Sequence, residues 1–308
     1  MTSAPAAAAA GLVGVTDPLQ ADLERRFGGL RRLYGQAAYL RVRQARVAVV
    51  GLGGVGSWAA EALARSGVAR LVLIDFDQVS ESNINRQVQA LGSTVGMAKV
   101  EALRRRIADI HPGCEVLAVE EFASPDNWPG LLPATVDVLI VACDQSAAKL
   151  TLAAWGLAGP VPVVCVGAAG GKLLAQAVAV ADLVEVSHDP LLASLRQRLR
   201  KQGAPRSGPI GLRCVFSRDG VSKPADDADC SLDGSLNCHG YGSSVTVTAT
   251  FGLVAAGEAL RLCRLQAGPT AKPAVLAAEK PTNDHARLSC STREGSLAQS
   301  VEQRTFNP

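Results

Sequence analysis

The stretch Arg46-Val-Ala-Val-Val-Gly51-Leu-Gly-Gly-Val-Gly56-Ser-Trp-Ala-Ala-Glu-Ala-Leu-Ala-Arg65 decides the fold. Its opening apolar run predicts a buried strand, and its Ala- and Leu-rich end predicts a helix with an apolar face. Between them, Gly51 allows a tight turn, Gly53 lets the backbone approach a phosphate, and Gly56 lets the helix pack closely on the strand. The helix N-terminus offers free N–H donors to an anion. This unit predicts a nucleotide site on a Rossmann-like sheet.

The strand–helix alternation continues along the chain. Further strands are predicted at 71–74, 116–119, 136–142 and 161–166, and helices at 34–44, 99–110 and 150–157. This order predicts an α/β fold with a doubly wound, mainly parallel sheet that binds ligands at the carboxyl ends of its strands. Asp75 and Asp144 each follow such a strand. After Gly171 the pattern mixes strands and helices and ends in an apolar helix over 251–263, which predicts a C-terminal mixed extension.

Composition indicates how the chain is organised. With 48% hydrophobic but only 4% aromatic residues, the core must rest on Val, Leu, Ile and Ala. We expect a flexible leader over 1–22, one nucleotide-binding domain over 23–265, and a disordered tail over 266–308. The eight cysteines include no C-x-x-C pair, which suits a reducing cytoplasm. The longest apolar run, 161–180, is broken by a proline and glycines, so we expect no membrane span.

The glycine pattern alone does not identify the nucleotide. It fits an NAD-dependent oxidoreductase equally well, and Asp75 could bind a ribose hydroxyl in either class. The segment Asp75-Phe-Asp-Gln-Val-Ser-Glu-Ser-Asn83-Ile-Asn-Arg86-Gln and the following Gly96-Met-Ala-Lys99 favour ATP. Triphosphate cleavage builds charge on the phosphates that fixed cations must compensate. Arginine provides a planar fork of donors for phosphate oxygens, and lysine a point charge.

These segments closely resemble the E1-like, ubiquitin-activating-type adenylating superfamily. The resemblance implies that Asp75 holds the ribose of ATP and that Asp144 binds Mg²⁺. The phosphates would be held by Asn83, Arg86 and Lys99, and the cofactor-binding residues would also include Gly51, Gly53, Gly54 and Gly56 of the glycine-rich turn. The resemblance also implies that an N-terminal arginine, Arg32 or alternatively Arg26, reaches the γ-phosphate in a neighbouring subunit, which requires a homodimer. The role of Asp77 stays open.

Further segments between residues 25 and 264 are similar to the tRNA threonylcarbamoyladenosine dehydratase branch of that superfamily. They are Arg26-Phe-Gly-Gly29, Arg32-Leu-Tyr-Gly35, 54–65, 167–171, 189–199, 213–217 and 247–252. The resemblance implies ATP-dependent dehydration of N6-threonylcarbamoyladenosine at position 37 of tRNA. The threonyl carboxylate would be activated, and an atom of the same modification would attack it to close a ring. Such an intramolecular attack needs no enzyme nucleophile, which fits a segment 172–213 without cysteine.

A basic crossover segment near 185–215 supports a tRNA partner. The cations from 196 to 213, with no Asp or Glu among them, are Arg196, Arg198, Arg200, Lys201, Arg206 and Arg213. A patch that follows the phosphate backbone is one interpretation, and a solvated helix face is the other.

Three rival functions remain open. Whether sulfur-transfer proteins are partners of a dehydratase also stays open. The first rival is an adenylyltransferase that activates the C-terminal glycine of a ubiquitin-like or sulfur-carrier protein. Such enzymes often carry paired C-x-x-C zinc ligands. Here Cys230 and Cys238-His239 have the wrong spacing, so we expect no zinc. The second is an NAD-dependent oxidoreductase, and the third is a non-catalytic tRNA-binding relative.

Overall fold

A seven-stranded sheet organises the computed structural model, which describes residues 22–132, 135–222 and 241–265. The strands are β1 (Arg46–Val50), β2 (Arg70–Ile74), β3 (Glu115–Val119), β4 (Val138–Val141), β5 (Val163–Val166), β6 (Val178–Asp182) and β7 (Arg213–Ser217). Their order across the sheet is β3-β2-β1-β4-β5-β7-β6. All neighbours are parallel except β6, which pairs antiparallel with β7 at one edge. The predicted α/β fold with a mainly parallel sheet is confirmed.

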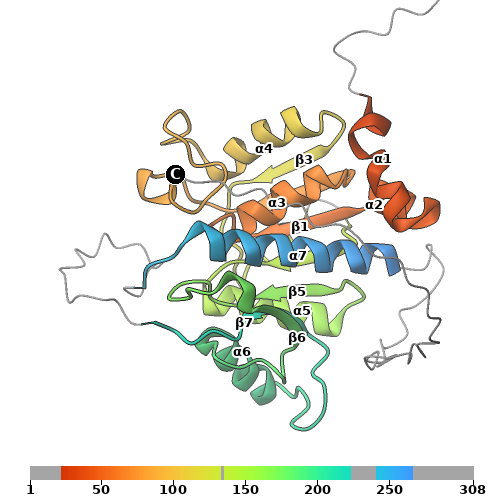
Figure 1. Ribbon diagram of the computed structural model, residues 1–308. Coiled ribbons are helices and arrows are strands. Elements are labelled where there is room, and N and C mark those ends of the chain that lie inside the picture. The colour runs from red at the N-terminus through yellow and green to blue at the C-terminus, as the bar shows by residue number, and fades with distance from the viewer. Residues whose placement is uncertain (1–21, 133–134, 223–240, 266–308) are drawn as a thin grey trace, which may run out of the picture. The chain divides into compact units, whose positions relative to one another are not determined.

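Helices cover both faces of this sheet (Figure 1). They are α1 (Leu23–Tyr34), α2 (Gln36–Gln44), α3 (Gly56–Arg65), α4 (Lys99–Ile110), α5 (Ser146–Ala158), α6 (Pro190–Lys201) and α7 (Val245–Leu265), with short 3-10 turns η1 (Glu81–Asn83) and η2 (Ala175–Ala177). Residues of α3, α4 and α7 form a core cluster with one face of the sheet, and residues of α5 and α6 form a second cluster with the other. The doubly wound arrangement expected from the sequence is therefore present.

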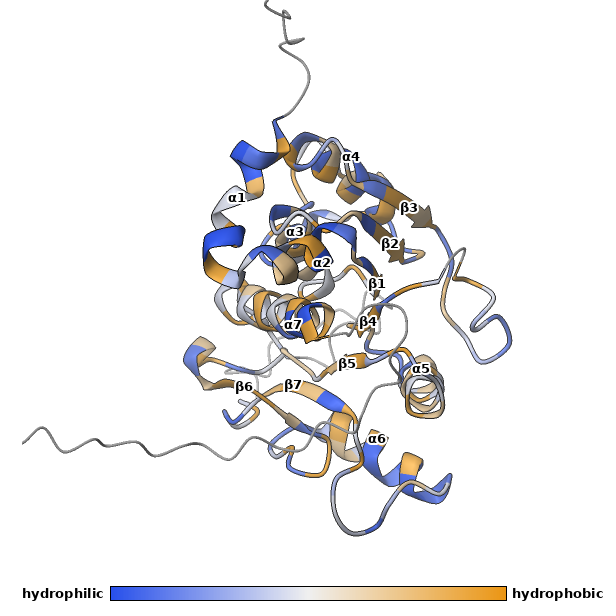
Figure 2. Ribbon diagram, turned by 90° about the vertical axis from the view of Figure 1, so that its right-hand side faces the viewer, coloured by the Kyte–Doolittle hydropathy of each residue, from blue (hydrophilic) through white to orange (hydrophobic). Residues whose placement is uncertain are grey.

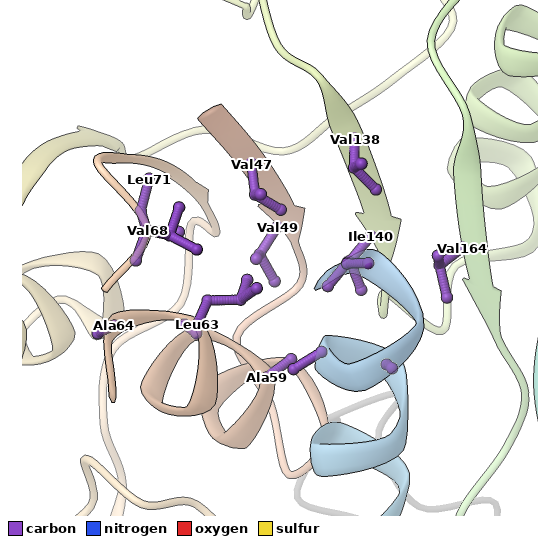
Figure 3. Close-up of a cluster of buried hydrophobic side chains, with 14 of the residues drawn as sticks. Val47, Val49, Ala59, Leu63, Ala64, Val68, Leu71, Val138, Ile140 and Val164 are labelled. Carbon is purple, nitrogen blue, oxygen red and sulfur yellow. The ribbon is translucent and has the colours of Figure 1, made fainter. Parts of the chain in front are cut away.

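Side-chain alternation along β1 builds these two clusters. Val47 and Val49 lie in the cluster with α3 and α7 (Figure 3), whereas Ala48 and Val50 lie in the opposite one. Successive residues of a strand point to opposite faces, and a parallel sheet covered on both sides buries both sets. This explains why the central strands are almost entirely apolar, with Val, Leu, Ile, Ala and Cys side chains, and are coloured mainly as hydrophobic in Figure 2.

Helix α1 is an element that the sequence analysis did not predict. Gly28 and Gly29 interrupt its pattern, and glycine weakens a helix interior. The tertiary structure compensates, because the Asp22 side chain caps the helix by accepting from the N–H of Arg25, and Phe27 is buried against His111.

Helix α7 begins earlier than predicted and is the core helix of the α3 side. Within the described residues it alone is long and apolar enough to meet the criteria for a membrane span, with 56% of the relevant window buried in the fold. Gly252 marks its contact with α3, because a Cβ there would lie 2.4 Å from the Val55 carbonyl oxygen and 2.7 Å from the Trp58 Cβ. A core helix of this kind passes the same length and composition test.

The predicted C-terminal mixed extension is part of the main sheet. Strand β7 inserts between β5 and β6, and four of its five residues are buried. The predictions for the leader (apart from Asp22), the tail and Cys230, Cys238 and His239 lie outside the described residues.

Candidate active site

The glycine-rich turn joins β1 to α3 at the carboxyl end of the sheet. Gly51 has φ +87°, and a Cβ there would lie 2.5 Å from the backbone nitrogen of Cys143. A Cβ on Gly56 would lie 1.8 Å from the Gly51 carbonyl oxygen. Only glycine therefore fits at these two positions, and the turn packs directly on the loop that follows β4. At Gly53 a Cβ would have no heavy atom within 4 Å, so the backbone there is open to a ligand, as expected for phosphate approach.

Asp75 ties the end of β2 to this turn. One carboxylate oxygen accepts from the N–H of Leu52 at 2.5 Å, and the other accepts from the N–H of Asp77 at 2.9 Å. Burial raises the pKa of the Asp75 carboxyl, and nearby Lys99 and the two N–H donors offset this only in part. The carboxylate is held beside the turn, where the ribose of a bound nucleotide is expected.

Lys99 begins α4, and its side chain is only 3% exposed. Its Nζ donates to Asp77 at 2.7 Å, and the Asp77 side chain is 40% exposed. Asp77, whose role the sequence left open, therefore orients the predicted phosphate-binding lysine. Because Asp77 is partly solvated, the Lys99 ammonium can weaken its ion pair with Asp77 and interact with a phosphate as a second anion.

The loop after β2 presents Asn83 and Arg86. Asn83 is buried and forms a capping box with Ser80, accepting from the Ser80 N–H at 3.2 Å, so it shapes the loop. The Arg86 guanidinium donates to the Ser82 carbonyl at 2.6 Å and to the Asn85 side chain at 3.1 Å. A Cβ on Gly54 would lie 3.3 Å from the Arg86 Cγ, which brings the arginine next to the glycine-rich turn.

Asp144 lies in the loop 142–145 between β4 and α5, and it is exposed. The same loop contacts Gly51, which places the carboxylate on the nucleotide side of the sheet. Among the residues that the structure describes, no group of three or more His, Cys, Asp or Glu side chains could hold a metal. A single exposed carboxylate suits Mg²⁺, which commonly takes its other ligands from phosphates and water.

The two N-terminal arginines, Arg26 and Arg32, lie on α1. Arg26 donates to the carbonyls of Asp109 and Ile110 at 2.9 and 2.6 Å, and so satisfies the C-terminus of α4. Lys99 is at the other end of that helix, whose 12 residues span about 18 Å. Arg32 is exposed on α1. A contact of Arg32 with the γ-phosphate of a neighbouring subunit stays a prediction.

The sequence of this chain matches a known protein family. A family model described as the ThiF family matches residues 26–298. The chain belongs to the ThiF family.

Individual relatives agree with this assignment. The tRNA threonylcarbamoyladenosine dehydratase of Escherichia coli (strain K12) is 40% identical over 248 residues, which cover 77% of this chain and 92% of that protein. The dehydratase of Haemophilus influenzae (strain Rd) is 38% identical over 253 residues, covering 80% and 97%. The solved structure of the E. coli dehydratase with ATP matches with TM-score 0.71 and 39% identity, covering 79% of this chain and 96% of that one. The structure of its complex with AMP matches with TM-score 0.72 and 40% identity, and it covers 79% of this chain and 96% of that one. The predicted resemblance to this branch is confirmed.

In this ThiF-family chain, three residues important for the site were not assigned a role from sequence. The indole N–H of Trp58 donates to the Arg86 carbonyl at 2.9 Å, and the Thr248 hydroxyl donates to the same oxygen at 3.5 Å. Gly252 lets α7 approach Trp58. These residues served only as markers of the family branch, because a contact across 162 positions leaves no local signal. Together they hold the backbone of Arg86 from α3 and α7.

The basic residues of the crossover segment are put to different uses. Arg196 donates to the carbonyls of Leu183 and Val186, Arg198 donates to the carbonyl of Ser146, and Arg213 forms an ion pair with Glu258 at 2.9 Å. Arg200 is half-buried. Lys201 and Arg206 are exposed. The six cations therefore do not point to one surface in the same way, and their contact with tRNA stays a prediction.

Proposed function

We propose that this chain is an ATP-dependent tRNA threonylcarbamoyladenosine dehydratase. It would convert N6-threonylcarbamoyladenosine at position 37 of tRNA to its cyclic form. The observation that carries the proposal is 40% identity over 92% of the E. coli dehydratase. A structural match to that enzyme's ATP and AMP complexes supports it.

The residues of the site suit activation of a carboxylate. The open backbone at Gly53 and the N-terminus of α3 receive the phosphates, and Asp75 receives a ribose hydroxyl. A carboxylate oxygen of the threonyl group attacks the α-phosphorus of ATP, and pyrophosphate leaves with charge that Arg86 and Lys99 compensate. An atom of the same modification then attacks the acyl carbon, loses its proton to solvent and expels AMP, which closes the ring. The ring closure is accelerated because the enzyme holds the modified nucleoside in one reactive conformer.

Mg²⁺ and a second subunit complete the proposal. Asp144 would hold Mg²⁺, which supplies compensation for phosphate charge. Exposed Arg32 would reach the γ-phosphate bound by the partner of a homodimer. The exposed cations at the C-terminal end of α6 and after it, Lys201 and Arg206, would contact the tRNA backbone. Because its substrate is tRNA, we place the enzyme in the cytoplasm.

The test is incubation of the full chain with ATP, Mg²⁺ and tRNA that carries threonylcarbamoyladenosine. Nucleoside mass spectrometry should show loss of one water. Arg86→Ala and Asp144→Ala should reduce that product by about a thousandfold or more, because each removes charge compensation in the transition state. Circular dichroism checks that both variants fold. Undiminished product from either variant would contradict that residue's assignment. ATP–pyrophosphate exchange that requires a small protein ending in Gly-Gly would instead identify a protein-activating enzyme.

A further inference from the structure

A second buried lysine, Lys149 on α5, is used by none of the steps above. It is only 1% exposed. Its Nζ donates to the carbonyl oxygens of Val141 at 3.2 Å and Val166 at 2.7 Å, and lies 4.0 Å from the Sγ of Cys165. Among the described residues Lys149 forms no ion pair, and the carboxylate of Asp189 acts on it only from beyond ion-pair distance. Burying an ammonium is costly, so its retention calls for a specific role.

The two carbonyl groups that Lys149 binds lie at the ends of two neighbouring strands. Val141 ends β4 and Val166 ends β5, and these strands are parallel neighbours in the sheet. One ammonium therefore joins two strands at their carboxyl ends, the edge of the sheet that bears the nucleotide site.

The Lys149 side chain fixes the start of the loop 142–145, because its Nζ donates to the carbonyl of Val141, the residue before the loop. The end of the loop is fixed by the first backbone hydrogen bond of α5, from the N–H of Lys149 to the carbonyl of Gln145 at 2.9 Å, which any residue except proline would make at this position. On the other side, the N–H of Ala142 donates to the Val50 carbonyl at 2.8 Å, and the backbone of Cys143 packs against Gly51. The loop that carries Asp144 is thus held between the glycine-rich turn and Lys149.

We propose that Lys149 is a positioning residue, which fixes Asp144 at the correct place relative to the phosphates bound by the glycine-rich turn. This inference rests on the proposed role of Asp144 as a Mg²⁺ ligand. A metal ligand contributes fully only when the groups behind it hold its orientation, and a displacement of a fraction of an ångström weakens both metal binding and catalysis.

The chain contains a matched control for this proposal. Lys172 is also buried, and its Nζ donates to two backbone carbonyls, those of His188 and Asp219, at 2.7 and 2.6 Å. Its partners lie in the loops after β6 and β7, not in the loop that carries Asp144. Removing either ammonium should lower Tm, but only the removal of the Lys149 ammonium should change the Mg²⁺ dependence of ATP binding.

The experiment titrates ATP into the full chain by calorimetry over a range of Mg²⁺ concentrations. Lys149→Met keeps the length of the side chain but removes its donors. We expect it to raise the half-saturating Mg²⁺ concentration by about tenfold or more, while ATP affinity without metal stays within about twofold. In the dehydration assay, kcat should fall more than the KM for ATP rises. Lys149→Arg, which keeps cationic donors, should restore most of the Mg²⁺ response. Lys172→Met should leave it unchanged.

The outcomes separate this inference from the proposed function. An unchanged Mg²⁺ response in folded Lys149→Met, or an equal shift in Lys172→Met, overturns it. If Lys149→Met lacks a cooperative melt, Lys149→Gln takes its place, and failure of both to fold overturns the inference in favour of a purely structural role. If Asp144→Asn retains the wild-type Mg²⁺ response, the assignment of Asp144 fails and the inference falls with it. If Asp144→Asn loses the response but Lys149→Met does not, only the inference fails.

Discussion

Two regions were predicted from sequence as candidate anion-binding sites. They are the glycine-rich corner, which consists of the turn 51–56 with Asp75, Asp77, Arg86 and Lys99, and the basic crossover segment 185–215. Their cationic side chains make different kinds of contact in the structure. At the glycine-rich corner, side chains from α4 and from the loops after β2 and β4 lie around one turn. Asp75 accepts from the N–H of Leu52, and Lys99 donates to Asp77. In the crossover segment, Arg196, Arg198 and Arg213 donate to groups inside the fold.

The difference teaches which sequence signals are dependable. A required glycine encodes a backbone geometry that other residues cannot adopt, as the positive φ of Gly51 and the close contact at Gly56 show. A count of arginines encodes no direction, because a long side chain can reach inward to unsatisfied carbonyls as well as outward to solvent.

Among the variants that compare the two regions, removing the buried Lys99 ammonium beside the glycine-rich turn should produce the largest effect. Lys99→Met should lower the dehydration rate by about a hundredfold to a thousandfold, because it removes charge compensation for the phosphates. Single-turnover mass spectrometry of the modified nucleoside measures this. Asp77→Asn, which leaves the ammonium in place but weakens its orientation, should cost less. If Lys99→Met retained most of the rate, the glycine-rich motif would identify functional residues no better than the run of basic residues does.

An intermediate effect is expected from the support behind Arg86. Trp58→Phe keeps the aromatic contact but removes the N–H that donates to the Arg86 carbonyl. The loss of one such bond, about 1 kcal/mol, should lower kcat by about fivefold. The control is Trp155→Phe, since Trp155 stacks edge-on against Trp128 on the other face of the sheet. Equal losses in the two variants would mean that Trp58 contributes general packing only.

The smallest effect is expected for the exposed cations of the crossover segment. The double variant Lys201→Glu with Arg206→Glu should weaken tRNA binding about threefold to tenfold and reduce the slope of log affinity against log salt by about two. Filter binding at several salt concentrations measures both.

Arg213→Gln provides the contrast to that double variant. It should lower Tm because it removes an ion pair with the buried Glu258, while tRNA affinity stays within about twofold. If Arg213→Gln weakened tRNA binding at unchanged Tm, the separation of outward from inward cations would be wrong.

Much of the fold could be predicted from local pattern. The helix over Lys99–Ile110 was predicted with its observed bounds, and the strands β1, β2 and β3 within one residue at either end. Helix α1 was missed because Gly28 and Gly29 hide it, and it depends on the burial of Phe27. The early start of α7 was missed because the Gly/Ser/Thr-rich sequence around Val245 is typical of a loop, yet residues such as Val247 are buried in the core.

The sequence by itself determined the glycine-rich turn and the family to which the chain belongs, and it supplied the candidate nucleotide-binding residues, because these depend on residue types at short, fixed spacings. The tertiary structure alone decided that Trp58 and Thr248 hold Arg86, that Asp77 holds Lys99, and that Lys149 joins the ends of β4 and β5. Of these, the contacts of Trp58, Thr248 and Lys99 join residues at least 22 positions apart, and the Lys149 contacts join the ends of two strands. They form only once the sheet has brought its strand ends to a common edge, so local sequence carries no sign of them.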